Sequence, residues 1–359
     1  MSGGFLYNGK FSFIGEGKKS VDMLIEKYIP RQVSEDSLMT LFGKPHYEYD
    51  VASIQKAIAD PVWNFLDRGG KRWRPALFLL IVEALGKNPQ DYEEFALIPE
   101  LIHNGTIIVD DIEDNSSMRR GKPALHKIYG TDVSINAGNM LYFLPLLSLI
   151  RDSLEDDVKL AAFRVYAEEM VNLHIGQSMD INWHRGESER ITEKQYLQMC
   201  AFKTGTLARM AARLAVVLCQ KGERMEKGLG CMAETIGIAF QIQDDILDVT
   251  LADRKKFGKS WGNDIREGKR SFMVVHVLEC GSRKDRRRLL EILDAPRKRM
   301  RDIREAIAIL QKYDSIDYAK SHARSLVSSG WDDVEGLLDD SDAKKHLHSF
   351  VNYLVEREF

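Results

Sequence analysis

The sequence predicts an all-α protein, and three observations support this prediction. Apolar residues recur at three- and four-residue spacing from about residue 51 onward, whereas alternating, strand-like runs are scarce. Only nine prolines interrupt the 359 residues, and several stand where helices would begin or end, such as Pro61, Pro75 and Pro123. Two expected helices, 76–85 and 141–150, are apolar on nearly every side and should be wrapped by others. We therefore expect a single large helical bundle with one core.

Composition and charge narrow the class of protein. A net charge of -3 and 44% hydrophobic residues are typical of a globular chain and argue against nucleic acid as the partner. The four cysteines form no CxxC pair, which favours a reducing compartment. The first residues lack the order of a secretory signal, and the most apolar segment, 140–150, is shorter than the roughly 20 residues that span a bilayer. We expect a cytoplasmic protein without stable membrane insertion.

The chain changes character near residue 50. Residues 1–50 contain more glycine, aromatic residues and polar breaks than the rest, with one short helix expected at 20–28. We interpret them as an N-terminal extension. We expect residues 51–359 to form one further domain.

Two acidic sequences have the same pattern. Asp110 to Asp114 reads DDIED and Asp244 to Asp248 reads DDILD, and each follows an apolar helical stretch. The first and last aspartates are four residues apart, so they share one face of a helix and repel each other. A hard cation such as Mg²⁺ relieves this repulsion, because it binds one or two carboxylates together with substrate phosphates. One copy could be an exposed acidic turn, but two copies predict a metal site.

Basic residues cluster in four places. Glycines beside a cluster let the backbone approach an anion, and arginine forks match phosphate oxygens. Each cluster alone is more often surface charge. Together with two acidic sequences they predict a site for two diphosphates, one bound through metal and one by cations alone. The clusters are Gly69 to Pro75, Arg119 with Arg120, Lys203 with Thr204, and Lys259 with Lys269.

From about residue 51 to the mid-300s, the chain resembles the trans-isoprenyl diphosphate synthases, or polyprenyl synthetases. The resemblance rests on GGKRWRP, ELIHNGTIIVDDIEDNSSMRRG, GQSMD, KTG, FQIQDDILD and GKSWGNDIREGK, in this order. It implies the isoprenoid synthase fold, a helical bundle around a deep central cavity, and a homodimer. It also implies a prenyltransferase with three Mg²⁺ ions that joins isopentenyl diphosphate head-to-tail to allylic diphosphates.

The same resemblance assigns roles to individual residues. Mg²⁺ would be bound by Asp110, Asp111, Asp114, Asp244 and Asp248, with Asp245 as a ligand or a support. The allylic diphosphate would bind these metals and the cations Arg119, Lys203, Lys259 and Lys269. Isopentenyl diphosphate would bind Gly70, Lys71, Arg74, His103 and Arg120 without metal. Thr204 and Gln241 would line the reacting carbons, and Phe240 the isopentenyl tail.

Product length in such enzymes depends on side chains below the first acidic sequence. Gly105 and Thr106 are small there, with Ile102 a turn deeper, and the aromatic plug of farnesyl synthases is missing. By resemblance to eukaryotic-type geranylgeranyl synthases, the floor would be formed by Tyr142, Phe143 and His174. This predicts geranylgeranyl diphosphate as the product. The alternative is that the two aromatic residues are ordinary core side chains.

Other functions compete with this interpretation. A longer-chain polyprenyl or a farnesyl diphosphate synthase would keep the reaction and change the product. A class I terpene cyclase also ionises a prenyl diphosphate, but it usually carries a different second metal sequence and needs no second diphosphate site. A non-catalytic synthase subunit would typically have lost one aspartate-rich sequence, and both are whole here.

Overall fold

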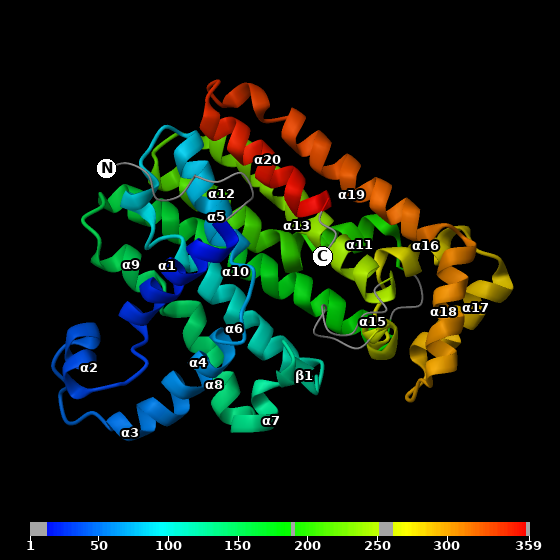
Figure 1. Cartoon of the computed structure of the whole chain (residues 1–359), viewed down its shortest axis with the longest axis horizontal. Helices are drawn as coiled ribbons and strands as arrows, with labels where there is room; N and C mark the ends of the chain where they lie inside the picture. The colour runs from blue at the N-terminus through cyan, green and yellow to red at the C-terminus, as the bar shows by residue number, and fades with distance from the viewer. Residues whose placement is uncertain (1–12, 188–190, 251–260, 357–359) are drawn as a thin grey trace. The chain divides into compact units, whose positions relative to one another are not determined.

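The computed structural model describes residues 13–187, 191–250 and 261–356, and nearly all of this part is helical (Figure 1). The all-α fold expected from the sequence is therefore confirmed. The contacts divide the chain into two compact units, residues 1–83 with 87–159, and residues 84–86 with 160–359. This division does not coincide with the boundary expected at residue 50.

Unit 1 consists mostly of short helices, and its longest helix, α6 with 17 residues, carries the first acidic sequence at its end. A two-residue antiparallel ribbon, β1 with β2, pairs Arg119 with Lys122. The elements of unit 1 are α1 (Phe13–Tyr28), α2 (Glu35–Phe42), α3 (Val51–Ile54), η1 (Gln55–Ala59), α4 (Asp60–Leu66), α5 (Trp73–Ala84), η2 (Pro89–Tyr92), α6 (Leu97–Glu113), β1 (Met118–Arg119), β2 (Lys122–Pro123), α7 (Leu125–Tyr129), α8 (Thr131–Phe143) and α9 (Leu146–Arg151).

The N-terminal segment belongs to the core of unit 1. Ile25 and Ile29 are buried in the same apolar cluster as Trp63 and Leu101. The indole Nε1 of Trp63 donates a hydrogen bond of 2.9 Å to the carbonyl oxygen of Ile29. The helix expected at 20–28 begins earlier, at Phe13. Residues 21–29 thus contribute apolar side chains to the core that also contains α4 and α6.

Helices α6 and α8 approach closely through two glycines. A Cβ atom at Gly105 would lie 2.6 Å from the carbonyl oxygen of Gly138 and 3.0 Å from the ring of Tyr142. A Cβ atom at Gly138 would lie 3.2 Å from the carbonyl oxygen of Gly105. Protein interiors are close-packed, so neither glycine can gain a side chain without moving a helix.

The apolar helix expected at 141–150 is interrupted. α8 ends at Phe143 and α9 begins at Leu146. Pro145 lies at the break because it has no N–H to continue the helical hydrogen bonds. By length and composition, Thr131–Arg151 would suffice to cross a membrane, with a mean hydropathy of 1.5, but 56% of its most apolar window is buried inside the protein. Helix α8, which forms most of this segment, packs against α6.

Unit 2 is built from long helices. Helix α13 carries the second acidic sequence near its end and packs against α12 and α19. The elements of unit 2 are α10 (Asp156–His184, whose first residues lie in unit 1), α11 (Glu193–Cys200), η3 (Ala201–Gly205), α12 (Thr206–Leu218), α13 (Glu223–Thr250), α15 (Asn263–Glu267), α16 (Phe272–Cys280), α17 (Arg283–Asp294), α18 (Met300–Lys312), α19 (Ser315–Asp332), η4 (Glu335–Leu337) and α20 (Asp342–Glu356).

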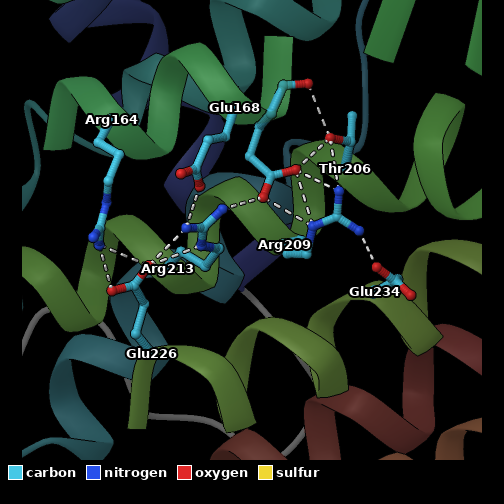
Figure 2. Close-up of polar contacts among 8 residues, drawn as sticks. Arg164, Glu168, Thr206, Arg209, Arg213, Glu226 and Glu234 are labelled. Carbon is cyan, nitrogen blue, oxygen red and sulfur yellow. Dashed lines mark hydrogen bonds and ion pairs between the residues drawn. The ribbon is translucent and has the colours of Figure 1, made fainter. Parts of the chain in front are cut away.

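An ion-pair network joins α10, α12 and α13, as Figure 2 shows. At its centre is Glu169, whose side chain is 0% exposed and lies 2.6 Å from both Arg209 and Arg213. The hydroxyl of Thr206 donates a further 2.6 Å hydrogen bond to it. Burial alone would raise the pKa of Glu169, but the hydrogen bonds and charges of these partners lower it below its ordinary value. The network holds the helices that carry the unit 2 residues of the site.

Candidate active site

The first acidic sequence forms the last turn of α6. Asp110 lies in this turn, and Asp114 is the C-cap residue that follows the last helical residue, Glu113. The C-terminal end of a helix carries partial negative charge, so carboxylates here are unfavourable unless a cation compensates. Asp110 keeps 20% of its side chain exposed, whereas the Asp111 side chain is fully buried. Asp110 and the half-buried Asp114 are thus more accessible than Asp111, and their expected role as metal ligands stays a prediction.

Asp111 has a different environment, because it binds Arg119. The Nε and one Nη atom of Arg119 lie 2.8 and 2.6 Å from Oδ1 of Asp111. Arg119 ends β1, and the tight β1–β2 ribbon fixes its position beside α6. The same guanidinium lies 3.8 Å from Asp110. This geometry favours Asp111 as the anchor of Arg119 over the direct metal ligand expected from the sequence.

A second group of cations surrounds the loop between α4 and α5. Arg120 stacks over the Phe65 ring at 4.8 Å and hydrogen-bonds the carbonyl oxygen of Gly69. Its other Nη lies 3.3 Å from Oδ1 of Asn104 on α6. Gly70 and Lys71 are exposed at the tip of this loop. The structure thus brings together the loop and Arg120, and their role as a metal-free diphosphate site stays a prediction.

His103 and Arg74 complete this cluster. Arg74 is buried, and its guanidinium stacks on the Trp73 ring at 4.5 Å. Burial and the neighbouring arginines, Arg74 and Arg120 foremost, hold the pKa of His103 well below its ordinary value, so the imidazole is neutral at pH 7. Burial, helped by nearby arginines and opposed by Glu100, lowers the pKa of Arg120 to about 10. A cluster with this excess of positive charge is suited to an anion.

The second acidic sequence lies in the last two described turns of α13. Asp245 is buried and accepts two hydrogen bonds of 2.8 Å, from the Tyr196 hydroxyl and from Nε2 of Gln241. Thr204 donates a 3.0 Å hydrogen bond to Oε1 of the same Gln241. Burial and the Asp264 carboxylate raise the pKa of Asp245. Thr204 and Gln241, expected near the reacting carbons, thus belong to one chain of hydrogen bonds that ends at Asp245.

Asp248 holds the start of α15. Its carboxylate accepts hydrogen bonds from the backbone amides of Asn263 at 3.0 Å and Asp264 at 3.1 Å, and only 1% of the residue is exposed. A carboxylate at a helix N-terminus is favourable because it meets unpaired N–H groups. These bonds favour Asp248 as a structural anchor over the metal ligand expected from the sequence. Asp244, which precedes both and is half-buried, keeps the expected ligand role as a prediction.

Lys203 lies in a π-helical turn, η3, of the kind often found at functional sites. Its Nζ is 2.5 Å from Oδ2 of Asp180 on α10. Glycines permit this arrangement, since a Cβ atom at Gly176 would lie 2.3 Å from the backbone nitrogen of Lys203. One at Gly237 on α13 would lie 2.5 Å from the Cα of Gly205. The close approach of α10, η3 and α13 gathers Lys203, Asp180 and the Gln241 chain within unit 2.

Three residues of these networks were not among those expected. Tyr196 and Asn104 are ordinary helix residues in the sequence, and only the fold shows that they bond Asp245 and Arg120. Asp180 stands in the GQSMD sequence, which was noted without a role for its acid. Of the remaining expected residues, Phe240 is half-buried and Lys269 lies 3.2 Å from Glu267. Lys259 lies outside the described residues.

The donor set suits Mg²⁺ shared with a substrate. Within residues 13–187, 191–250 and 261–356, no three His, Cys, Asp or Glu side chains converge to form a metal centre by themselves. Mg²⁺ characteristically takes one or two carboxylates, waters and phosphate oxygens. Asp110 and Asp114 within unit 1, and Asp244 within unit 2, each carry hard oxygen atoms of this kind, and their role in binding Mg²⁺ stays a prediction.

The expected chain-length residues have different environments. Ile102 is buried, and Tyr142 packs against Gly105, so no room is left beside that glycine. Thr106 is half-buried and hydrogen-bonds the carbonyl oxygen of His103. Phe143, in contrast, is 64% exposed. His174, in unit 2, is also exposed. Gly105 is therefore small because two helices cross there, and the floor remains a prediction.

The chain has an all-α fold, two aspartate-rich sequences and an arginine cluster. These features together are typical of enzymes that bind diphosphate substrates with a divalent cation. Comparison with known proteins identifies the class. The polyprenyl synthetase profile matches residues 55–310. A short chain isoprenyl diphosphate synthase of Methanothermobacter thermautotrophicus is 36% identical over 82% of this chain and 89% of its own. A geranylfarnesyl diphosphate synthase of Aeropyrum pernix is 33% identical over 87% and 98%.

A solved structure agrees with these relatives. The geranylgeranyl pyrophosphate synthetase of Pyrococcus horikoshii is 32% identical and superimposes with a TM-score of 0.83, covering 97% of this chain and 98% of that one. The chain belongs to the polyprenyl synthetase family. It is a trans-prenyltransferase with the all-α fold of that family.

Proposed function

We propose that this enzyme condenses isopentenyl diphosphate with allylic diphosphates, using Mg²⁺, and that its main product is geranylgeranyl diphosphate. The observation that carries the reaction is the presence of two kinds of anion site. Unit 1 contains a basic cluster formed by Gly70, Lys71, Arg74 and Arg120. This cluster would bind an anion through its own positive charges and includes no metal ligands. Each unit also carries carboxylates at a helix end. A terpene cyclase needs only the second kind, and a non-catalytic subunit needs neither.

Different residues bind isopentenyl diphosphate and Mg²⁺ in this proposal. Arg120, Arg74 and Lys71 bind isopentenyl diphosphate through its phosphates, and the neutral His103 adds a hydrogen bond without adding charge. Asp110 and Asp114 in unit 1, and Asp244 in unit 2, provide oxygen ligands. Mg²⁺, when bound to these carboxylates, neutralises the charge that develops on the departing allylic diphosphate. Three such ions are part of this proposal.

In the same proposal, Arg119 and Lys203 donate hydrogen bonds to the allylic diphosphate, each poised by a carboxylate in the protein. Arg119 is held by Asp111 and Lys203 by Asp180, so both side chains are pre-positioned before the substrate arrives. Apolar helix walls exclude water from the carbocation that forms as the diphosphate leaves. The double bond of isopentenyl diphosphate attacks that cation, and the released diphosphate accepts the proton that is then lost.

The product length is the finer part of the proposal. Relatives of 32–36% identity carry three different descriptions, short chain, geranylgeranyl and geranylfarnesyl, so identity alone does not choose among them. Tyr142 supports a geranylgeranyl length, because it is buried on α8 against the middle of α6, below the first acidic sequence. Phe143 and His174 remain expected residues of the cavity floor. Both side chains are exposed, so the structure supports them less than it supports Tyr142.

We also propose that the enzyme is a homodimer in the cytoplasm. Leu160, Val171 and Ile175 lie on one face of α10 and are 72%, 60% and 45% exposed. Such a stripe on a long helix is suited to an identical stripe on a second copy, because apolar surface favours burial. Light scattering on purified protein tests this. A dimer that becomes monomeric on Val171→Glu supports the stripe, and a wild-type monomer refutes it.

The reaction is tested with purified protein, Mg²⁺, labelled isopentenyl diphosphate and each allylic primer in turn, with product length read by mass. Accumulation of the geranylgeranyl product from shorter primers supports both parts of the proposal. A series of longer products, as a geranylfarnesyl or polyprenyl synthase would give, supports the proposed reaction and refutes the proposed product length. No elongation by folded protein with any primer refutes the reaction.

A further inference from the structure

The loop that joins α4 to α5 has a strained backbone. Arg72 adopts φ of 50°, a left-handed conformation that costs a non-glycine residue about 1–3 kcal/mol. Gly69, two residues before Lys71, adopts φ of 95°. Strained residues persist only where their surroundings over-determine them. The loop that presents Gly70 and Lys71 to solvent must therefore be held from the protein side.

The side chain of Arg72 attaches the loop to the rest of unit 1. Its side chain is only 2% exposed, and its two Nη atoms reach different carboxylates. One lies 2.6 Å from Oε1 of Glu100 on α6 and the other 3.0 Å from Oδ1 of Asp22 on α1. Two charge-assisted bonds to a buried guanidinium are strong and directional. The loop is thus bonded on one side to α6 and on the other to the N-terminal helix.

Glu100 also links the ion pairs of Arg72 to Arg120. Nδ2 of Asn104 donates a 2.8 Å hydrogen bond to Oε1 of Glu100, the same atom that accepts from Arg72. Oδ1 of Asn104 accepts in turn from Arg120 at 3.3 Å. A displacement of Arg72 would therefore change the position of Arg120 as well as that of the loop.

The N-terminal segment contacts the loop at its other end too. Arg31, three residues after α1, forms two hydrogen bonds of 2.9 and 3.0 Å to the carboxylate of Asp67, just before Gly69. Its guanidinium also stacks over the Trp63 ring at 3.7 Å. Asp22 and Arg31, the N-terminal clasp, thus hold a residue inside the loop and a residue at its start.

We propose that the N-terminal clasp is a positioning device for the isopentenyl diphosphate site, acting through Arg72 on the loop and on Arg120. This inference rests on the proposed function, since it takes that site's ligand from it. It gives residues 21–31 a role that their place ahead of the family profile does not suggest. The clasp contacts no substrate, so its loss should weaken one substrate's binding and leave the chemical step intact.

The test is steady-state kinetics of Asp22→Asn in the full-length enzyme, with each substrate varied in turn. We expect the KM for isopentenyl diphosphate to rise about fivefold, the equivalent of one partly exposed charged hydrogen bond. The kcat and the KM for the allylic primer should stay within about twofold. The matched control is Lys27→Met, which removes an α1 ion pair to Glu94 that does not involve the loop. It should leave all three constants unchanged.

A second variant tests the route. In an Arg72→Met background, Asp22→Asn should add no further effect, because its partner is gone. If Arg72→Met does not fold, Arg31→Met replaces it and should again raise only the KM for isopentenyl diphosphate. Equal constants for wild type and Asp22→Asn overturn the clasp, as does a fall in kcat alone. Wild-type protein that neither binds nor elongates isopentenyl diphosphate overturns the proposed function instead.

Discussion

Replacing Glu169 by glutamine should destabilise the protein far more than any surface charge change. The Glu169 carboxylate is fully buried and accepts hydrogen bonds from Thr206, Arg209 and Arg213 (Figure 2). Glutamine keeps the shape, but it removes the charge and turns an N–H₂ group toward arginine donors. Removing one partner of a buried ion pair typically costs about 3–5 kcal/mol.

The magnitude follows from what the two arginines retain. Arg209 keeps Glu234, and Arg213 keeps Glu168 and Glu226, so neither guanidinium is left without a carboxylate. We therefore expect the lower end of the range, about 3 kcal/mol in the free energy of unfolding. Glu168→Gln is the matched control, because Glu168 is the preceding residue, binds the same arginine and is 48% exposed. Its loss should cost under about 1 kcal/mol.

Urea-induced unfolding of the two variants and the wild type, followed by circular dichroism at pH 7.5, measures the difference. The pH dependence gives a second readout. The folded pKa of Glu169 is lowered, so its stabilisation is complete above the ordinary value of 4.5 and is lost as the pH falls through the lower folded value. The gap between wild type and Glu169→Gln should therefore shrink below about pH 4. Equal midpoints for the two glutamine variants would refute the reasoning.

Three further predictions concern the site. Tyr196→Phe removes the hydroxyl that bonds Asp245 and should lower kcat about tenfold, measured with saturating substrates; an unchanged kcat would show that this bond is dispensable. Gly237→Ala places a methyl group against the backbone of η3 and should cost about 1–3 kcal/mol with loss of activity, whereas Gly336→Ala, which meets open space, should change neither; equal melting temperatures would contradict the close approach. Tyr142→Ala should lengthen the product seen by mass spectrometry, and an unchanged length would remove Tyr142 from the floor.

Much of the fold was accessible from the sequence because its signals are local. Helical periodicity predicted the all-α class, and both acidic sequences lie as expected after apolar helical stretches, at the end of α6 and near the end of the described part of α13. The break at Pro145 shows the limit of the apolar pattern. A run of apolar residues does not show whether the backbone hydrogen bonds continue through it, although the proline itself was the available signal.

The different environments of the aspartates could not be predicted from the sequence. All six stand in two similar patterns, but only the tertiary structure gives Asp111 an arginine, Asp245 a tyrosine and Asp248 two backbone amides. These partners come from segments 8 to 49 residues away. The smallness of Gly105 was likewise ambiguous, because an open space and a helix crossing both require a small residue.

The docking of the N-terminal segment could not be predicted from the sequence for a related reason. Glycine and aromatic residues gave residues 1–50 the composition of an extension, yet Ile25 and Ile29 are core residues and Asp22 bonds Arg72. A short amphipathic helix gives a weak periodic signal, and its docking depends on distant helices. Composition therefore could not show that this segment belongs to unit 1.

The central claim is that one diphosphate is bound by basic side chains without metal and the other through Mg²⁺. Calorimetric titration tests it most directly, with isopentenyl diphosphate and with a non-reactive thio analogue of an allylic diphosphate, each in excess Mg²⁺ and in excess chelator. The account predicts that isopentenyl diphosphate binds about equally in both conditions, whereas the allylic analogue binds only with Mg²⁺. Loss of isopentenyl diphosphate binding in chelator, or full binding of the allylic analogue without metal, would contradict it.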